Sequence, residues 1–150
     1  MKIALYQPDI ALNLGANLRT AACLGVDVEI IEPCGFPFDD RKIRRAGMDY
    51  IDHVNYTRHN SWNHFREWAA KNGHRIILLS SKATTSYTEF KFLKNDILML
   101  GRESAGVPED VSKNCNHSVT IPMQPNTRSL NVAISAAIVL GEAIRQTKIV

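Results

Sequence analysis

The stretch "DILMLGRESAGVPEDV", residues 96–111, contains an apolar run, a loop with two glycines and the start of a helix. The run Asp96–Leu100 is almost continuously apolar, as strands covered on both faces of a sheet are. Pro108 suits the first turn of a helix, and Glu109 and Asp110 suit its positive end. The end of such a strand, next to a helix start, presents unpaired backbone N–H groups to a ligand.

The loop does not have the residues of the common nucleotide sites. Gly101 and Gly106 have the spacing of a P-loop, but a P-loop continues with Lys and Ser or Thr, and Val107 and Pro108 follow here. The loop after the first apolar run, residues 7–19, has one glycine and lacks the GxGxxG pattern of a dinucleotide site. No nucleophile-elbow signature marks a hydrolase. Phosphotransferase, dehydrogenase and hydrolase functions therefore have no positive support.

Short β-rich runs alternate with helical stretches along the chain. The predicted strands are residues 2–6, 26–32, 54–56, 75–80, 96–100 and 118–121. The predicted helices are residues 14–24 (capped by Asn13 and ended by Gly25), 41–46, 61–71, a helix starting at Pro108, and 130–144 (capped by Ser129). The alternation predicts one α/β domain over residues 1–150, with a mainly parallel sheet and helices on both faces. Residues 130–144 are apolar almost all round, so this helix is either central to the core or part of an oligomer interface.

Composition excludes several classes of protein. With 45% apolar and 22% charged residues, the 150-residue chain has the composition of a soluble globular protein. No apolar run approaches the roughly 20 residues that span a bilayer, and the N-terminus does not have the pattern of a signal peptide. Three widely spaced cysteines, Cys23, Cys34 and Cys115, predict neither a disulfide framework nor a zinc site and suit a reducing cytoplasm. We expect no metal, and the net charge of +3 favours an anionic partner only weakly.

Three stretches differ from plain scaffold: NLGANLR (13–19), GRESAG (101–106) and IPMQPNTRSLN (121–131). Each lies where a strand or loop leads into a helix, a position that supplies backbone donors to ligands. Taken singly, each has a simpler interpretation as a tight turn, a helix cap, a surface charge or a stiffened loop. Together they favour a ligand site, although their pattern does not name the ligand.

The same three stretches carry a family resemblance. Their signatures N-x-G-x-x-x-R, G-x-E-x-x-G and IPM…SLN, in this order, resemble the SPOUT class of RNA methyltransferases. The stretches IIEPCGFPFDDRKIRRAGMDY (30–50) and TRHNSW (57–62) narrow the resemblance to the small tRNA (cytidine/uridine-2′-O)-methyltransferases of the TrmL type, which act on the wobble nucleotide. The resemblance runs from Ile3 to about Gln146, nearly the whole chain.

The resemblance implies an S-adenosylmethionine site within a C-terminal trefoil knot, a homodimer and a tRNA substrate. Pattern analysis alone does not predict a knot, because knots are rare among folds. The family's catalytic arginine corresponds to Arg19, which we expect to hold the hydroxyl or phosphate and to stabilise negative charge, since a guanidinium hardly deprotonates. The implied cofactor-binding residues are Leu79, Gly101, Glu103, Ile121, Ser129, Leu130 and Asn131.

A basic helix is the implied RNA-binding element. Its cations are Arg41, Lys42, Arg44 and Arg45, flanked by Phe36 and Phe38. By itself this run would be a solvated helix face, and with tRNA as the implied substrate it becomes a phosphate-binding surface. The chain departs from the family pattern at Ala16, Arg102, Ala105 and Gly141. An RNA- or cofactor-binding protein without catalysis, and a 2′-O-methyltransferase for another RNA site, are the alternatives.

Overall fold

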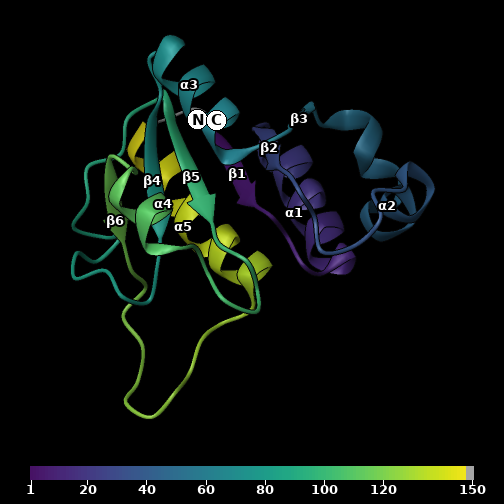
Figure 1. Cartoon of the computed structure of the whole chain (residues 1–150). Helices are drawn as coiled ribbons and strands as arrows, with labels where there is room; N and C mark the ends of the chain where they lie inside the picture. The colour runs from purple at the N-terminus through teal and green to yellow at the C-terminus, as the bar shows by residue number, and fades with distance from the viewer. Residues whose placement is uncertain (148–150) are drawn as a thin grey trace.

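A six-stranded parallel sheet, in the order β3-β2-β1-β5-β4-β6, forms the centre of the molecule (Figure 1). The computed structural model describes residues 1–147, and for residues 46–49 the backbone alone. The strands are β1 (Lys2–Tyr6), β2 (Asp27–Ile31), β3 (Tyr56–His59), β4 (Arg75–Leu79), β5 (Asp96–Leu100) and β6 (His117–Val119). All their pairings are parallel. The predicted α/β class and parallel sheet are confirmed, while residues 148–150 of the predicted domain lie outside the described range.

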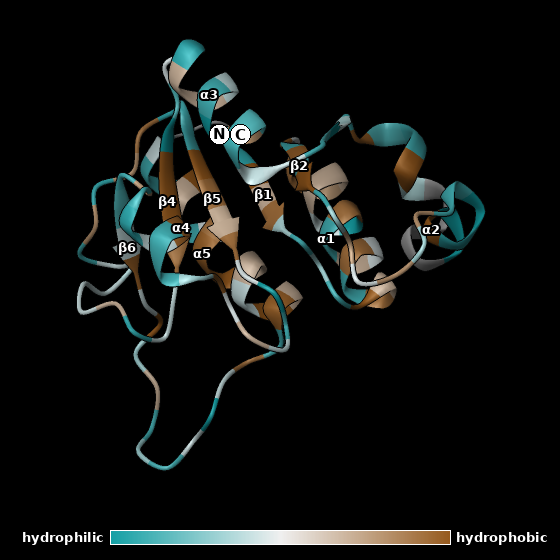
Figure 2. Cartoon of the chain, viewed as in Figure 1, coloured by the Kyte–Doolittle hydropathy of each residue, from teal (hydrophilic) through white to brown (hydrophobic). Residues whose placement is uncertain are grey.

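Helices cover both faces of the sheet. On β1, Ile3 and Leu5 belong to one core, and Ala4 and Tyr6 belong to the other, as the two-residue period of a strand requires. The first face is covered by α1 (Ala11–Leu24) and α5 (Val132–Thr147), and α2 (Asp40–Gly47) and the 3-10 helix η1 (Met48–His53) pack in turn against α1. The second face packs against α3 (Trp62–Lys71) and α4 (Glu109–Lys113). Figure 2 shows the apolar strands between these helices.

Most predicted elements lie where the sequence places them, and β3 does not. The predicted strand at 54–56 is wrong in position, because β3 begins at Tyr56, which pairs with Val28, and ends at His59 opposite Ile31. Thr57 and Arg58 are exposed on this edge strand, so they lack the apolar pattern on which the prediction relied.

Two predicted helix caps are also wrong. α1 begins at Ala11, with Ile10 at its N-cap, and Asn13 lies within the helix. α5 begins at Val132 rather than at residue 130, and its cap is Asn131. Asn131 Oδ1 accepts hydrogen bonds from the backbone N–H groups of Ala133 (2.8 Å) and Ile134 (3.3 Å). A polar side chain that satisfies two unpaired N–H groups of the first turn is the usual way to start a helix.

The structure confirms the first of the two alternatives for α5, a place in the core, and the interface stays a prediction. One side of the helix is in the core, where Ala136, Val139, Leu140 and Ala143 are fully buried. The other side is exposed and still apolar, with Ile134 54% exposed and Ile138 37% exposed. The helix therefore belongs to the core and also leaves an apolar stripe uncovered within this chain.

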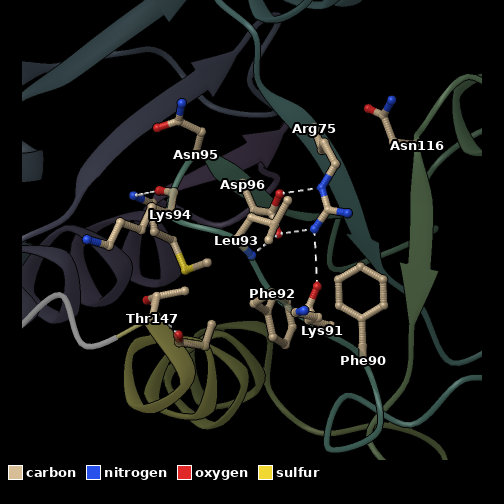
Figure 3. Close-up of polar contacts among 12 residues, drawn as sticks. Arg75, Phe90, Lys91, Phe92, Leu93, Lys94, Asn95, Asp96, Asn116 and Thr147 are labelled. Carbon is tan, nitrogen blue, oxygen red and sulfur yellow. Dashed lines mark hydrogen bonds and ion pairs between the residues drawn. The ribbon is translucent and has the colours of Figure 1, made fainter.

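Ionic contacts fix the amino ends of β4 and β5 (Figure 3). The guanidinium of Arg75 donates to both carboxylate oxygens of Asp96, each at 2.7 Å, and Asp96 is buried. Asp96 Oδ2 also accepts from the backbone N–H of Leu93 at 2.8 Å. A bidentate pair with a further hydrogen bond is a strong, directional contact. It holds one end of the central strands, and the candidate site lies at the other end.

Candidate functional site

A cavity of about 850 Å³ lies at the carboxyl ends of β4, β5 and β6, next to the start of α1. In the sheet order, β2 and β3 lie on one side of β1, and β4, β5 and β6 lie on the other. The direction of the chain across the sheet therefore reverses beside β1, and ligands of open α/β sheets bind at such a switch point. We call this cavity the central cleft. It is lined by all the residues that the sequence analysis assigned to cofactor binding, namely Leu79, Gly101, Glu103, Ile121, Ser129, Leu130 and Asn131.

The two glycines of the loop after β5 are required for different reasons, Gly101 by a close approach of the backbone and Gly106 by its left-handed conformation. The N–H of Arg102 donates to the carbonyl of Gly106 at 3.1 Å, and the N–H of Gly106 donates back at 2.9 Å. A Cβ on Gly101 would lie 2.8 Å from Cα of Gly106, and Gly106 has φ of +60°. The loop is thus folded on itself, unlike a P-loop, which wraps an anion with its free N–H groups.

A chain of hydrogen bonds connects the three motifs across the central cleft. Asn131 Nδ2 donates to Asn13 Oδ1 at 3.1 Å. Asn13 Nδ2 donates to Glu103 Oε1 at 3.4 Å. The other oxygen of Glu103 accepts from the backbone N–H of Asp9 at 2.7 Å. Both carboxylate oxygens of Glu103 are therefore engaged in holding the loops at the ends of β1 and β5 together.

Asp9 is a site residue that the sequence analysis missed. Its Oδ2 accepts from the backbone N–H of Ser104 at 3.1 Å and from the Ser104 hydroxyl at 2.5 Å. These hydrogen bonds from Ser104 hold the pKa of the Asp9 carboxyl below its usual value, since they favour the charged form. The two residues are 95 positions apart, and no local pattern signals such a contact.

Arg19 lies on an exposed part of α1, outside the described lining of the central cleft. It is six residues beyond Asn13, about 9 Å farther along the helix axis. Its guanidinium carbon is 4.9 Å from the centre of the Tyr50 ring. The structure thus brings the cofactor-binding candidates together in one chain but does not place Arg19 among them.

The four cations of the basic helix are exposed on α2, as the sequence analysis predicts. The helix is anchored by Ile43, which is 1% exposed. Arg44 Nη1 makes an ion pair with Asp52 of η1 at 2.9 Å, so part of its charge is already compensated. Beside the helix, the guanidinium of Arg58 lies over the ring of Phe38 at 3.9 Å.

Among the side chains that the structure describes, those of residues 1–45 and 50–147, no group of three or more His, Cys, Asp and Glu is arranged to hold a metal ion. Within the same range, no helix combines the length and the apolar character needed to cross a membrane.

The central cleft has the size and chemistry for S-adenosylmethionine. Its volume lies within the range of small-molecule sites, about 300–1,000 Å³. Leu79, Leu100 and Ile121 provide apolar surface next to the ends of the strands, where backbone polar groups are available. Lys82 and Glu103 add charges of both signs to the lining. Such a cleft suits a nucleoside with a charged amino-acid end.

Comparison with known proteins decides the family. The model of the SpoU rRNA Methylase family matches residues 1–141. The chain belongs to this family. A relative from Beijerinckia indica, named tRNA (cytidine(34)-2′-O)-methyltransferase, is 58% identical over 144 residues, which are 96% of this chain and 90% of the relative. A protein of the same name from Escherichia coli K12 is 36% identical over 97% of this chain and 93% of its own length.

Solved structures of SpoU-type enzymes have the same fold. One, from work on the 2-OH methylation of C/U34 on tRNA, is 39% identical and superposes with a TM-score of 0.91, covering 97% of this chain and 94% of the other. The AdoMet-bound rRNA methyltransferase of Sinorhizobium meliloti is 27% identical, with a TM-score of 0.87, over 96% of this chain and 55% of its own.

Proposed function

We propose that this SpoU-family chain transfers a methyl group from S-adenosylmethionine to the ribose 2′-hydroxyl of nucleotide 34, the wobble nucleotide, of tRNA. The observation that carries the proposal is the 58% identity, over 96% of the chain, to a tRNA (cytidine(34)-2′-O)-methyltransferase. The connected motifs of the central cleft support its cofactor-binding part, because Asn13, Glu103 and Asn131 hold the walls of the cleft together.

We assign cofactor binding to the lining of the central cleft. Leu79, Gly101 and Ile121 lie at or just after the ends of their strands and offer backbone groups, and Ser129 and Leu130 line the cleft from the segment before α5. When bound, S-adenosylmethionine supplies a methyl group activated by its sulfonium. This chain then has to orient the acceptor ribose in line and exclude competing water, which are tasks of positioning.

Arg19 is the proposed catalytic residue. A ribose hydroxyl is a poor nucleophile at neutral pH, so negative charge develops on its oxygen as the proton leaves. A guanidinium has only donors and stays protonated, so Arg19 holds the hydroxyl or the adjoining phosphate and stabilises that charge, and another group accepts the proton. Loss of one such donor typically lowers turnover by about 10²-fold or more.

The exposed cations of α2 are the proposed contacts for the tRNA backbone. Arg41, Lys42, Arg44 and Arg45 belong to one exposed helix whose buried side, with Ile43, is fixed in the core. When clustered cations contact phosphates, the counterions condensed on the nucleic acid are released. This release is a large part of the affinity of proteins for nucleic acids. Because tRNA is the substrate, we place the reaction in the cytoplasm, where the free thiols of Cys23, Cys34 and Cys115 are stable.

We further propose that the active form is a homodimer and that the C-terminal half is knotted. The dimer is supported by the exposed apolar residues Leu12, Ile134 and Ile138 on α1 and α5. The knot is supported by contacts of α5 inside the 80–95 segment, where Gln146 donates to the carbonyl of Phe90 and accepts from the N–H of Phe92. An experimental chain trace with α5 outside that segment would contradict the knot.

Methyl transfer to tRNA from a strain that lacks this enzyme tests the function directly. Purified protein with labelled S-adenosylmethionine should label the tRNA, and mass spectrometry of nuclease fragments should place the methyl group on the ribose of nucleotide 34. Arg19→Ala should retain cofactor binding, measured by calorimetry with the demethylated cofactor, and lose about 10²-fold in single-turnover rate. Labelling at another position, or none at all, would refute the proposed function.

A further inference from the structure

The side chain of Arg19 starts from an exposed position on α1, and the ring of Tyr50 lies against its guanidinium. An unrestrained arginine loses considerable rotamer entropy when it is fixed on a substrate. We propose that Tyr50 of η1 is a positioning residue that holds the Arg19 guanidinium on its ring, in the orientation used for the reaction. The inference rests on the proposed role of Arg19 and extends it to a second residue.

The geometry of the pair supports this role. The guanidinium carbon of Arg19 lies 4.9 Å from the centre of the Tyr50 ring, within the range of a cation–π contact. Arginine stacks on aromatic rings in preference to lysine, because its guanidinium is planar and weakly hydrated. In a parallel stack the N–H donors, which lie in the guanidinium plane, point along the ring face and stay available to a ligand. The contact is thus compatible with donation to a ribose oxygen or a phosphate.

Tyr50 is itself held in place by its neighbours. The next residue, Ile51, is 6% exposed and belongs to the first core together with Leu14 and Leu18 of α1. η1 therefore packs on the same helix that carries Arg19. A ring fixed by a buried neighbour reduces the number of positions open to the arginine, which is what a positioning residue has to do.

The basic helix is connected to the same element. Arg44 of α2 pairs with Asp52 of η1 at 2.9 Å, so the proposed phosphate-binding helix is joined by an ion pair to the 3-10 helix that carries Tyr50. A tRNA phosphate that binds Arg44 would compete with Asp52 for its guanidinium and so change a contact of η1. Arg19, Tyr50 and the cations proposed to bind RNA thus belong to three helices that contact one another.

Two substitutions separate the ring from the hydroxyl. Tyr50→Phe keeps the ring and should keep the single-turnover rate within about twofold of wild type at saturating tRNA and S-adenosylmethionine. Tyr50→Leu removes the ring and should lower that rate by about three- to thirtyfold, the range expected for one cation–π contact. Binding of the demethylated cofactor and of tRNA should change less than threefold in both variants. A loss of rate with retained binding and with rescue by Phe is not expected of a residue that only stabilises the fold.

Phe90→Leu is the matched control, because it removes another ring under an arginine, Arg75 at 5.5 Å, at the far end of the sheet (Figure 3). Its rate per folded molecule should equal that of wild type. The double variant Arg19→Ala with Tyr50→Leu should be no slower than Arg19→Ala alone, since the ring acts through Arg19.

The outcomes distinguish this inference from the proposed function. A wild-type protein that methylates nothing refutes the function itself. An inactive Arg19→Ala beside a fully active Tyr50→Leu overturns the role of Tyr50 alone. Equal losses in Tyr50→Phe and Tyr50→Leu, or an additive loss in the double variant, overturn it as well.

Discussion

Asn131 and Asn13 are 118 positions apart and are joined by a hydrogen bond of 3.1 Å across the central cleft. The same Asn131 side chain caps α5 through its oxygen. One residue thus fixes both the start of the last helix and its distance from α1. Because Asn13 in turn donates to Glu103, the wall of the cleft depends on this contact.

Asn131→Ala should therefore affect stability and cofactor affinity together. Loss of the cap should cost about 1 kcal/mol of unfolding free energy. Loss of the contact to Asn13 should weaken binding of the demethylated cofactor at least severalfold, measured by calorimetry. Ser129→Ala serves as the comparison for the cap, because Ser129 precedes the helix and is exposed. If Ser129→Ala costs more unfolding free energy than Asn131→Ala, the assignment of the cap is wrong.

Asp9→Ala should weaken cofactor binding with little effect on tRNA affinity, because Asp9 holds Ser104 of the loop after β5. Asp9→Asn keeps an oxygen acceptor and should lose less. Asp27→Ala is the control, since Asp27 is also hydrogen-bonded, to Lys2, and lies at the opposite end of the sheet. Equal cofactor affinities in Asp9→Ala and wild type would show that the loop does not need this contact.

The contribution of Asp9 also has a defined pH dependence. Its pKa is lowered in the folded state by the hydrogen bonds from Ser104, so the stabilisation is complete above the ordinary pKa of 3.8. It is lost only as the pH falls through the lowered folded-state value. The ratio of cofactor affinities between wild type and Asp9→Ala should therefore be constant from pH 6 to 8. A ratio that changes across this interval would point to another titrating group.

The sequence predicts the strands better than the site contacts, for physical reasons. β1 and β5 are apolar on both faces, so their composition marks them, whereas β3 is an edge strand with exposed Thr57 and Arg58. The family resemblance placed the cofactor residues in one cleft. It did not reveal Asp9, whose partner Ser104 is distant in sequence and is met only after folding.

The buried carboxylate of Glu29 should contribute more to the stability of the protein than an exposed ion pair does. Glu29 is 1% exposed, and its carboxylate pairs with Lys2 at 3.1 Å and with His59 at 2.7 Å. Glu29→Ala leaves the buried His59 ring without this partner and removes one of the two carboxylates that Lys2 contacts, so it should cost about 3–5 kcal/mol in urea unfolding. Glu109→Ala removes an exposed pair with Lys113 and should cost under about 0.5 kcal/mol. Similar costs for the two variants would contradict this ranking.

Ile134→Glu should prevent dimer formation without unfolding the chain. Ile134 is 54% exposed on α5, so a carboxylate is hydrated in the monomer and would be desolvated in an apolar interface. Sedimentation should show a monomer for the variant and a dimer for wild type, and the variant should be inactive. Ala136→Glu, in the core, should instead unfold the protein. A wild-type monomer with full activity would refute the dimer proposal.

Replacing the cations of α2 should have two kinds of effect, one on tRNA affinity alone and one on tRNA affinity and the single-turnover rate together. Arg45 and Arg41 are exposed, and their replacement by Ala should weaken tRNA binding and lower the salt slope by about one unit for each lost phosphate contact. Arg44→Ala also removes the ion pair to Asp52, so it should lower tRNA affinity and, through η1, the single-turnover rate. Filter binding at several salt concentrations and rates at saturating tRNA measure the two effects separately.

Asp52→Ala separates the ion pair from the phosphate contact, because it leaves the charge of Arg44 in place. If the pair to Asp52 matters for η1, this variant should reproduce the loss of rate seen in Arg44→Ala while it binds tRNA at least as tightly as wild type, since a nearby negative charge is gone. A salt slope that falls in Asp52→Ala as it does in Arg45→Ala would contradict the assignment of phosphate contact to the cations of α2. If the salt dependence of tRNA affinity is unchanged in both Arg41→Ala and Arg45→Ala, the RNA-binding surface lies elsewhere on the molecule.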